Sequence, residues 1–364
     1  MKYISFLIKP ASSLCNMRCR YCFYYDVADH REVRSHGIMQ EDTMKALIDR
    51  ALDLDEEADI TFAFQGGEPT VAGLSFFEAF TSYVDANKKR QTIHYALQTN
   101  GTLLDERWAD LFKRYHFLIG ISLDGYMQLH DHLRKDAQYE GTFKRVMKSI
   151  ELLKQKNVDF NILTVLSSYV SAHPQKLFAF YLKHDLKYIQ FIPCLAGLEE
   201  KESEFSLHPK QFASFYKVFF DLWFKEYQKG NYISVTLFDN VIPMFVGYPP
   251  QQCGMLGHCA PQFVVESNGD ISPCDFYVLD QYCCGNIKDH SLYELASCDT
   301  MRKFLKEPRR DCESCKDCPF ERMCHRNCKR LNSAYYDEVY CGYRELLEYA
   351  GERMARIAQT INRR

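Results

Sequence analysis

The eight residues Cys15-Asn16-Met17-Arg18-Cys19-Arg20-Tyr21-Cys22 form a C-x3-C-x2-C pattern directly after a strand-like apolar run, Tyr3–Ile8. Three thiolates on one short loop can bind three irons of a 4Fe-4S cube and leave the fourth iron open. The same donors could instead bind zinc together with a distant fourth ligand, or be buried thiols that only lie close. The position of the loop after a predicted strand favours the cluster.

Strand-like and helix-like stretches alternate over the first two-thirds of the chain. Further strands are expected at Ile60–Gln65, Thr92–Gln98, Phe117–Ser122, Val158–Val165 and Tyr188–Ile192. Helices are expected at Glu41–Leu54, Leu74–Lys89, Asp105–Arg114, Thr142–Lys156, Pro174–His184 and Pro209–Gln228. Six strand-then-helix units predict an α/β fold with a parallel sheet and helices outside it. Since a full barrel has eight units, we expect a partial, open (β/α)6 barrel, with a doubly wound sheet as the alternative.

The character of the chain changes near residue 230. Twelve of the sixteen cysteines lie between Cys253 and Cys341. The run Gln262–Glu266 before an Asn-Gly turn predicts a hairpin, and Tyr343–Ile361 predicts a closing amphipathic helix. We therefore expect a barrel domain over residues 1–230 and a cysteine-rich C-terminal domain over residues 231–364.

Composition excludes several classes of protein. The 364 residues carry a formal net charge of −3, which argues against electrostatic nucleic-acid binding. No apolar run approaches the roughly 20 residues of a membrane helix. The N-terminal apolar stretch is too short for a signal peptide, so a cytoplasmic location is expected. In a reducing compartment, clustered cysteines more often bind metal or do redox chemistry than form disulfides.

The Cys-x3-Cys-x-Tyr-Cys pattern of Cys15, Cys19 and Cys22 resembles the signature of the radical S-adenosylmethionine superfamily. In that family the open iron binds the methionine part of S-adenosylmethionine. Motifs after the next three predicted strands match this resemblance, because glycines let backbone approach a ligand and a carboxylate suits an ammonium group. The cofactor-binding residues that it implies are Tyr21, Gly66, Gly67, Glu68, Ser122, Asp124 and Arg134.

The C-terminal cysteines resemble the SPASM extension of that superfamily, which carries two auxiliary 4Fe-4S clusters. The resemblance implies one cluster on Cys253, Cys259, Cys274 and Cys328, and another on Cys315, Cys318, Cys324 and Cys341. Three 4Fe-4S clusters and S-adenosylmethionine are thus the expected cofactors, with zinc as the competing metal for the C-terminal cysteines. Cys194, Cys283, Cys284, Cys298 and Cys312 are left over as structural or free thiols, although Cys312 offers an alternative first ligand to the second set.

The whole chain is similar to the anaerobic sulfatase-maturating enzymes. Stretches that carry the likeness include Gln65-Gly66-Gly67-Glu68-Pro69-Thr70, Gln98-Thr99-Asn100-Gly101 and Pro273–Asp280. Cys324-His325-Arg326-Asn327-Cys328 departs from the family by lacking the expected glycines. The resemblance implies a radical oxidoreductase that converts a Ser or Cys of a sulfatase peptide to Cα-formylglycine. The rival reaction is that of another SPASM-type peptide maturase, which makes thioether crosslinks or epimers; a non-catalytic electron carrier or zinc module is more distant.

The implied mechanism needs a base and an electron acceptor. A 5′-deoxyadenosyl radical takes a hydrogen from the target Cβ, the side chain loses a proton, and the auxiliary clusters accept the second electron. Asp275 matches the family's proposed catalytic Asp, although it could instead cap a turn. Tyr24, Gln65 and Gln98 are the candidate substrate contacts. Expected partners are the sulfatase polypeptide and a low-potential electron donor such as flavodoxin or ferredoxin, with no nucleic acid and no membrane.

Overall fold

The computed structural model describes residues 2–199, 202–310 and 312–361. The chain divides into two compact units, each built from three segments. The first comprises Met1–Ser122, Asp131–Phe160 and Ala260–Glu307, and the second comprises Leu123–His130, Asn161–Cys259 and Pro308–Arg364. These units cut the chain at places other than residue 230, so the division expected there stays a prediction.

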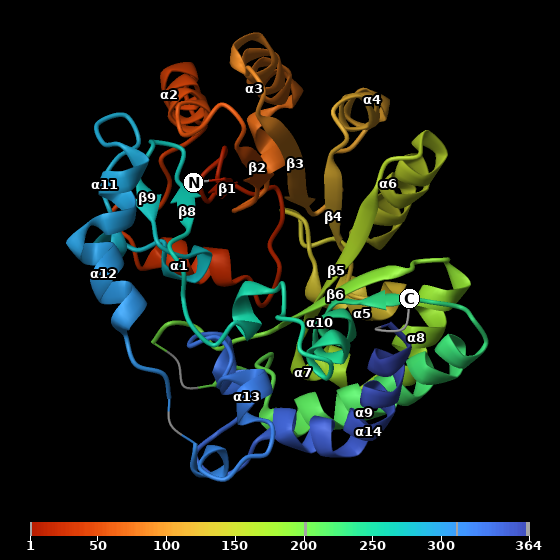
Figure 1. Cartoon of the computed structure of the whole chain (residues 1–364). Coiled ribbons are helices and arrows are strands. Elements are labelled where there is room, and N and C mark those ends of the chain that lie inside the picture. The colour runs from red at the N-terminus through yellow and green to blue at the C-terminus, as the bar shows by residue number, and fades with distance from the viewer. Residues whose placement is uncertain (1, 200–201, 311, 362–364) are drawn as a thin grey trace. The chain divides into compact units, whose positions relative to one another are not determined.

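The first unit is built on a largely parallel sheet. Strands β1 (Tyr3–Ile8), β2 (Asp59–Phe64), β3 (Thr92–Thr99) and β4 (Leu118–Ser122) pair in parallel in that order. Helices α2 (Glu41–Leu52), α3 (Leu74–Asn87) and α4 (Glu106–Arg114) connect them and lie on one side of the strands, with α6 (Phe143–Lys156) beside them (Figure 1). Helices on one side are typical of a barrel, whereas a doubly wound sheet carries helices on both faces.

The predicted hairpin extends this sheet. Strand β8 (Phe263–Val265) pairs in parallel with β1, and β9 (Ile271–Ser272) pairs antiparallel with β8. The strand order of the unit is therefore β4-β3-β2-β1-β8-β9. Residues far along the chain thus lie beside the first strand.

An aromatic row crosses four strands of the first unit. Phe263, Phe6, Phe62 and Tyr95 occupy matching positions on β8, β1, β2 and β3. Neighbouring ring centroids are 5.6 Å, 5.8 Å and 6.1 Å apart along the row. Because side chains alternate between the two faces of a strand, this row keeps one face apolar. It packs against α3, where Phe80 meets Phe62 edge-on at 5.0 Å.

The second unit contains the remaining parallel strands. Strands β5 (Phe160–Leu166), β6 (Tyr188–Pro193) and β7 (Ser234–Val235) pair in parallel. Helices α8 (Pro174–Lys183), α9 (Pro209–Gln228) and α14 (Gly342–Ile361) belong to this unit. A Cβ on Gly342 would lie 2.1 Å from the Pro209 carbonyl oxygen, so a glycine lets α14 begin against the start of α9. All six expected strands are present, and the expected α/β architecture is confirmed.

The sequence pattern did not predict several short helices and turns, because they are too short to show a repeating apolar face. The short α-helices are α1 (Phe23–Asp29), α5 (Met127–Leu133), α7 (Ser168–Ser171), α10 (Thr236–Met244), α11 (Leu292–Ser297), α12 (Asp299–Lys306) and α13 (Glu321–Cys324). Single 3-10 turns are η1 (Pro69–Ala72), η2 (Cys253–Met255), η3 (Asp275–Tyr277), η4 (Asp280–Tyr282), η5 (Glu313–Cys315) and η6 (Leu331–Ala334).

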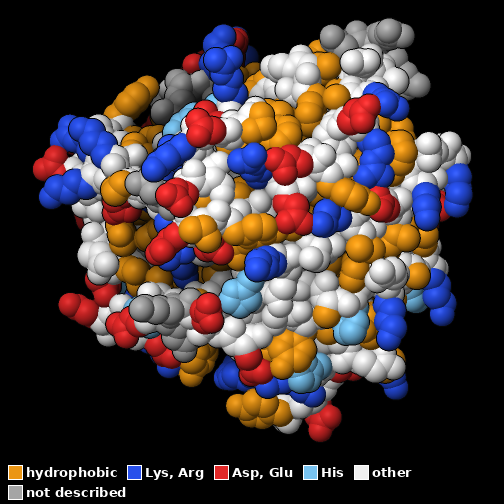
Figure 2. Space-filling view, turned by 90° about the horizontal axis from the view of Figure 1, so that it is seen from below, with side chains coloured by type: hydrophobic (Ala, Val, Ile, Leu, Met, Phe, Trp, Pro, Cys, Tyr) orange, Lys and Arg blue, Asp and Glu red, His pale blue; other side chains and the backbone are white. Residues whose placement is uncertain are grey.

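Charges of both signs are mixed on the surface. Figure 2 shows Lys and Arg interspersed with Asp and Glu over the face that it presents. This mixing agrees with a net charge of only −3. Within the described part of the chain, none of the helices has the length and apolar character needed to cross a bilayer.

Candidate functional site

The loop between β1 and α1 carries Cys15, Cys19 and Cys22, which are all partly buried. The amide of Glu68, from the loop after β2, donates to the Leu14 carbonyl at 2.8 Å and anchors this cysteine loop. Burial, reinforced by the Glu68 carboxylate, raises the pKa of the Cys15 thiol to about 12. A thiolate is therefore favoured there only when a cation binds it. Three soft thiol donors on one anchored loop fit a 4Fe-4S cluster with an open iron.

Glu68 is buried, with an exposed fraction of 1%. Its Oε1 accepts from the Thr70 amide at 3.0 Å, the Thr70 hydroxyl at 2.6 Å and the Thr99 hydroxyl at 2.7 Å. Its Oε2 accepts from the Asn100 amide at 2.7 Å. Burial raises the pKa of Glu68, and these hydrogen bonds oppose that shift. The carboxylate thus joins the loop after β2 to the end of β3, and its expected contact with S-adenosylmethionine stays a prediction.

Gly67 lets the loop after β2 pack directly against the cysteine loop. A Cβ there would lie 2.2 Å from the Leu14 carbonyl oxygen, and backbone cannot yield as a flexible side chain can. We expect Gly67→Ala to displace the cysteine loop, to cost about 1–3 kcal/mol of stability and to lower the iron content. Thermal melting and iron analysis of the reconstituted protein measure both effects.

Gly351 is the matched control for this substitution. It lies inside α14, where an added Cβ would meet the Phe245 ring at an ordinary 3.4 Å. Gly351→Ala is expected to raise helix stability by up to about 1 kcal/mol and to leave iron binding unchanged. Normal stability and iron content in Gly67→Ala would contradict the close-packing argument.

Asp275 lies at the start of η3 and meets two other predicted residues. Its Oδ2 accepts from the Tyr24 hydroxyl at 2.6 Å and from the Gln65 amide Nε2 at 3.2 Å. Gln65 Nε2 also donates to the Tyr24 hydroxyl. Burial and the negative charge of Asp275 raise the pKa of Tyr24 well above its usual value, so Tyr24 stays a protonated donor. The structure therefore brings together three residues from α1, the end of β2 and the η3 turn.

Lys9 completes this group and was missed by sequence reasoning. Its ammonium Nζ lies 2.9 Å from Asp275 Oδ1, and the two side chains are 5% and 14% exposed. The signal that could have found it is a lysine between Ile8 and Pro10, at the end of a strand that is otherwise apolar. Buried charges are paired as a rule, so such a lysine indicates a carboxylate partner.

Four other candidate residues of the first unit, three for the cofactor and one for the substrate, lie in two pairs. Gln98 Nε2 donates to the Ser122 hydroxyl at 3.2 Å, which joins the ends of β3 and β4. The Arg134 guanidinium lies over the Tyr21 ring, 5.6 Å from its centroid. Arg134 is buried, so this cation–π contact is shielded from water. The two pairs stay candidate contacts for cofactor and substrate.

Asp124 belongs to the second unit. It is fully buried, its Oδ1 accepts from the Val165 amide at 3.0 Å, and its amide donates to His130 Nδ1 at 3.2 Å. These bonds place Asp124 among the structural contacts of β5. Its expected role in binding the cofactor stays a prediction.

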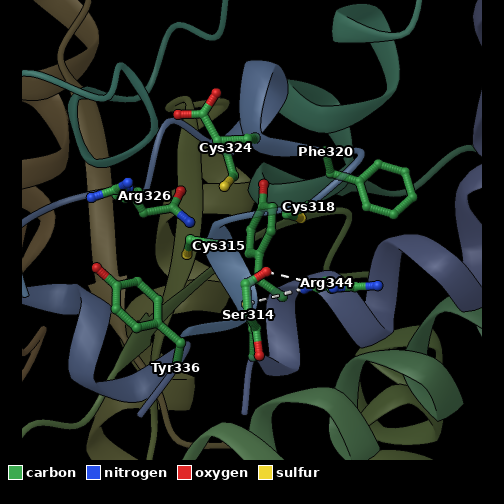
Figure 3. A pocket seen from close by; sticks show the side chains of 12 residues that line it. Ser314, Cys315, Cys318, Phe320, Cys324, Arg326, Tyr336 and Arg344 are labelled. Atoms are coloured by element: carbon green, nitrogen blue, oxygen red, sulfur yellow. Dashed lines mark hydrogen bonds between the residues drawn. The ribbon is translucent and has the colours of Figure 1, made fainter. Parts of the chain in front are cut away.

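Four predicted cluster ligands of the second unit share one pocket. Cys315, Cys318, Cys324 and Cys341 line it together. Figure 3 shows the sulfur atoms of Cys315, Cys318 and Cys324 around a common space. The grouping is the one expected for the second auxiliary cluster. Across the described ranges, no set of three or more His, Cys, Asp or Glu side chains is arranged to hold a single metal ion.

Cys312 remains an alternative member of that set. It is buried in a small cluster with Cys315 and Tyr336, against which Cys341 packs. The other expected set, Cys253, Cys259, Cys274 and Cys328, has Cys274 in the first unit and the rest in the second. Both ligand sets therefore stay predictions.

Among the leftover thiols, burial raises the pKa of Cys194 to about 12, which suits an inert core thiol. Cys284 contacts Cys298, and burial together with this contact raises the pKa of Cys284.

The stretch from Cys324 to Cys328, which lacks the expected glycines, adopts a backbone conformation that glycine prefers. His325, Arg326 and Asn327 have φ values of 46°, 62° and 52°, in the left-handed region. The left-handed conformation costs a non-glycine residue about 1–2 kcal/mol. We expect Arg326→Gly to raise the free energy of unfolding by about 1 kcal/mol, measured by denaturant titration of the reconstituted protein.

Arg322 provides the control for that prediction. It lies in α13, where glycine costs about 1 kcal/mol relative to a good helix former, so Arg322→Gly should destabilise. Equal destabilisation by both substitutions would contradict the prediction. It would show that contacts of the Arg326 side chain stabilise the fold by more than its left-handed backbone destabilises it.

Two family profiles and several relatives match this chain. The Radical SAM superfamily profile matches residues 10–179, which contain the cysteine loop, and the SPASM iron–sulfur cluster-binding domain profile matches residues 259–319. The chain is 40% identical to a cysteine-type anaerobic sulfatase-maturating enzyme of Clostridium perfringens over 99% of this chain and 100% of the relative. It is 30% identical to a serine-type enzyme of Bacteroides thetaiotaomicron over 89% of this chain and 82% of the relative.

A solved structure is similar over nearly the whole chain. It is described as native anSMEcpe with bound AdoMet and Cp18Cys peptide. The identity is 38%, the TM-score is 0.91, and the match covers 99% of both chains. The similarity thus extends over nearly the whole of both chains. This chain belongs to the anaerobic sulfatase-maturating enzymes, a family of the radical S-adenosylmethionine superfamily with a SPASM iron–sulfur cluster-binding domain.

Proposed function

We propose that the protein oxidises a target cysteine of a sulfatase polypeptide to Cα-formylglycine. The main support is the similarity over 99% of the chain to a cysteine-type enzyme, against the lower identity to a serine-type enzyme. The similarity to a structure that holds AdoMet and a peptide supports the same substrate class. The reducing power would come from a low-potential carrier such as flavodoxin or ferredoxin in the cytoplasm.

The residues present fit the cofactors of the family. Cys15, Cys19 and Cys22 would hold the first cluster, and the loops that end β2, β3 and β4 would receive S-adenosylmethionine at its open iron. When bound, these groups supply the one-electron chemistry that removes a hydrogen atom from the target Cβ. The expected auxiliary clusters would take the second electron.

The chain's own residues supply the proton chemistry. Asp275 accepts the proton of the target thiol, and it is partly shielded from water at 14% exposure. Tyr24 and Gln65 donate to its Oδ2, and so orient the carboxylate. After loss of one hydrogen atom, one proton and one electron, the Cys side chain becomes a thioaldehyde. Water then converts the thioaldehyde to the aldehyde and releases the sulfur as hydrogen sulfide.

The test uses the anaerobically reconstituted enzyme with dithionite and S-adenosylmethionine. Two sulfatase-type peptides that differ only in Cys or Ser at the target position are incubated and weighed by mass spectrometry. We expect the Cys peptide to lose one sulfur and two hydrogens and to gain one oxygen. Release of 5′-deoxyadenosine should accompany this change. Faster conversion of the Ser peptide would overturn the cysteine preference. Release of 5′-deoxyadenosine with both peptides unchanged would favour another peptide maturase.

A further inference from the structure

Lys9 holds the Asp275 carboxylate by the oxygen that Tyr24 and Gln65 leave unused. Oδ2 accepts from Tyr24 and Gln65, whereas Oδ1 faces the Lys9 ammonium at 2.9 Å. Oδ1 is buried and accepts no hydrogen bond of good geometry from the described residues, so the ionic contact with Lys9 is its main compensation. The two oxygens of Asp275 thus have different partners.

We propose that Lys9 is the positioning residue that sets the orientation of the Asp275 carboxylate for proton transfer. The inference rests on the proposed function, in which Asp275 takes the proton of the target thiol. A lysine is a compact point charge, and here it acts on one carboxylate oxygen only. With Oδ1 held, rotation of the carboxyl group is blocked and Oδ2 stays beside Tyr24. A general base must keep such a position to within hydrogen-bond reach of its proton.

Lys9 is itself rigidly placed. Its amide donates to the Val265 carbonyl of β8 at 2.8 Å, and its carbonyl accepts from the Ser12 amide at 3.1 Å. Its ammonium lies 4.2 Å from the centroid of the Tyr24 ring, so the cation also contacts a second member of the group. Because the position of Lys9 is fixed, its ammonium can hold the Asp275 carboxylate in one orientation.

Gly66 leaves room for this lysine. Its φ is +124°, and a Cβ at that position would lie 3.1 Å from Lys9 Cγ. The glycine-rich loop after β2 thus accommodates the Lys9 side chain as well as the expected cofactor. This packing keeps the lysine stem against the loop and directs its ammonium to Asp275.

A buried lysine could also serve stability alone, so the test needs a matched pair elsewhere. Arg31 and Glu266 form such a pair in the same unit, with Nη1 and Oε2 2.7 Å apart and side chains 7% and 2% exposed. Removing one partner of a buried pair destabilises the fold because it leaves a charge unpaired. Arg31→Met therefore reports the cost of a broken buried pair that does not touch Asp275.

The experiment compares reconstituted wild type with Lys9→Met, Lys9→Arg and Arg31→Met. We expect kcat of Lys9→Met for the Cys peptide to fall about 100-fold with KM unchanged, because a small misplacement of a reacting group costs that much. The number of 5′-deoxyadenosine molecules released per oxidised peptide should rise, since the radical is made but the proton step fails. Lys9→Arg should restore part of kcat. Arg31→Met should lower the melting temperature and keep the wild-type kcat.

Crystal structures of the reconstituted wild type and Lys9→Met provide a readout that does not depend on turnover. The inference predicts that Asp275 turns away from Tyr24 only in Lys9→Met. An unmoved Asp275, or a folded Lys9→Met with wild-type kcat and product ratio, would overturn it. If the wild type itself leaves the peptide unchanged, the proposed function is wrong, and the position of Asp275 in the two structures still decides the role of Lys9.

Discussion

Asp275→Asn is expected to slow oxidation of the Cys peptide by about 10²–10⁴-fold, the usual contribution of a general base. Asparagine has nearly the same shape but cannot accept the thiol proton. Release of 5′-deoxyadenosine should continue, because the cysteine loop lies outside the contacts of Asp275 with Tyr24, Gln65 and Lys9. Parallel measurement of oxidised peptide and 5′-deoxyadenosine separates the two steps.

Asp280 offers a control from the same segment. Its Oδ2 accepts from the Glu32 amide at 2.8 Å, so it is also hydrogen-bonded within the first unit. Asp280→Asn keeps an acceptor at that position and should retain the wild-type rate. If Asp275→Asn oxidised the peptide as fast as Asp280→Asn, Asp275 would be a structural residue and another base would have to exist.

Replacing Cys15, Cys19 and Cys22 together with alanine is expected to abolish both products. These thiolates are the proposed ligands of the first cluster, so their loss should leave S-adenosylmethionine with no iron to bind and no electron source. The iron content should fall by about four atoms per chain, and the auxiliary clusters should remain. Iron analysis, electron paramagnetic resonance and the 5′-deoxyadenosine assay together measure this loss.

Cys194 supplies the matched thiol for that experiment. It is buried at 4% exposure, and burial raises its pKa. Cys194→Ala should keep the iron content and both products. If the triple variant kept its full iron content, or if the wild type bound zinc in place of iron, the assignment of the first cluster would be wrong.

Much of the fold could be predicted because its evidence is local. Strand β1 spans Tyr3–Ile8 and helix α9 spans Pro209–Gln228, both as the apolar pattern predicts. Cysteine spacing indicated the first cluster, and four of the later cysteines do line one pocket. Short helices such as α1 and α13 were missed, since one or two turns carry too little periodicity to be seen.

The candidate site was only partly predictable. Asp275, Tyr24 and Gln65 were proposed separately, and their contact depends on pairs 251 and 210 residues apart in sequence. Lys9 was not proposed, because a lysine at a strand end does not show which of the chain's carboxylates it pairs with. Glu68 was expected to bind the cofactor, and its four hydrogen bonds to Thr70, Thr99 and Asn100 became visible only in the structure.

By itself the sequence determined the parallel α/β architecture and the cysteine loop, because periodicity and ligand spacing are properties of neighbouring residues. The family entered through the resemblance of its motifs. The tertiary structure decided which side chains share a site. Pairing of β8 with β1 brings the segment that contains Asp275 beside Lys9. Such a contact depends on the pairing of strands that are far apart in sequence and on burial of their side chains. Patterns among neighbouring residues do not contain this information.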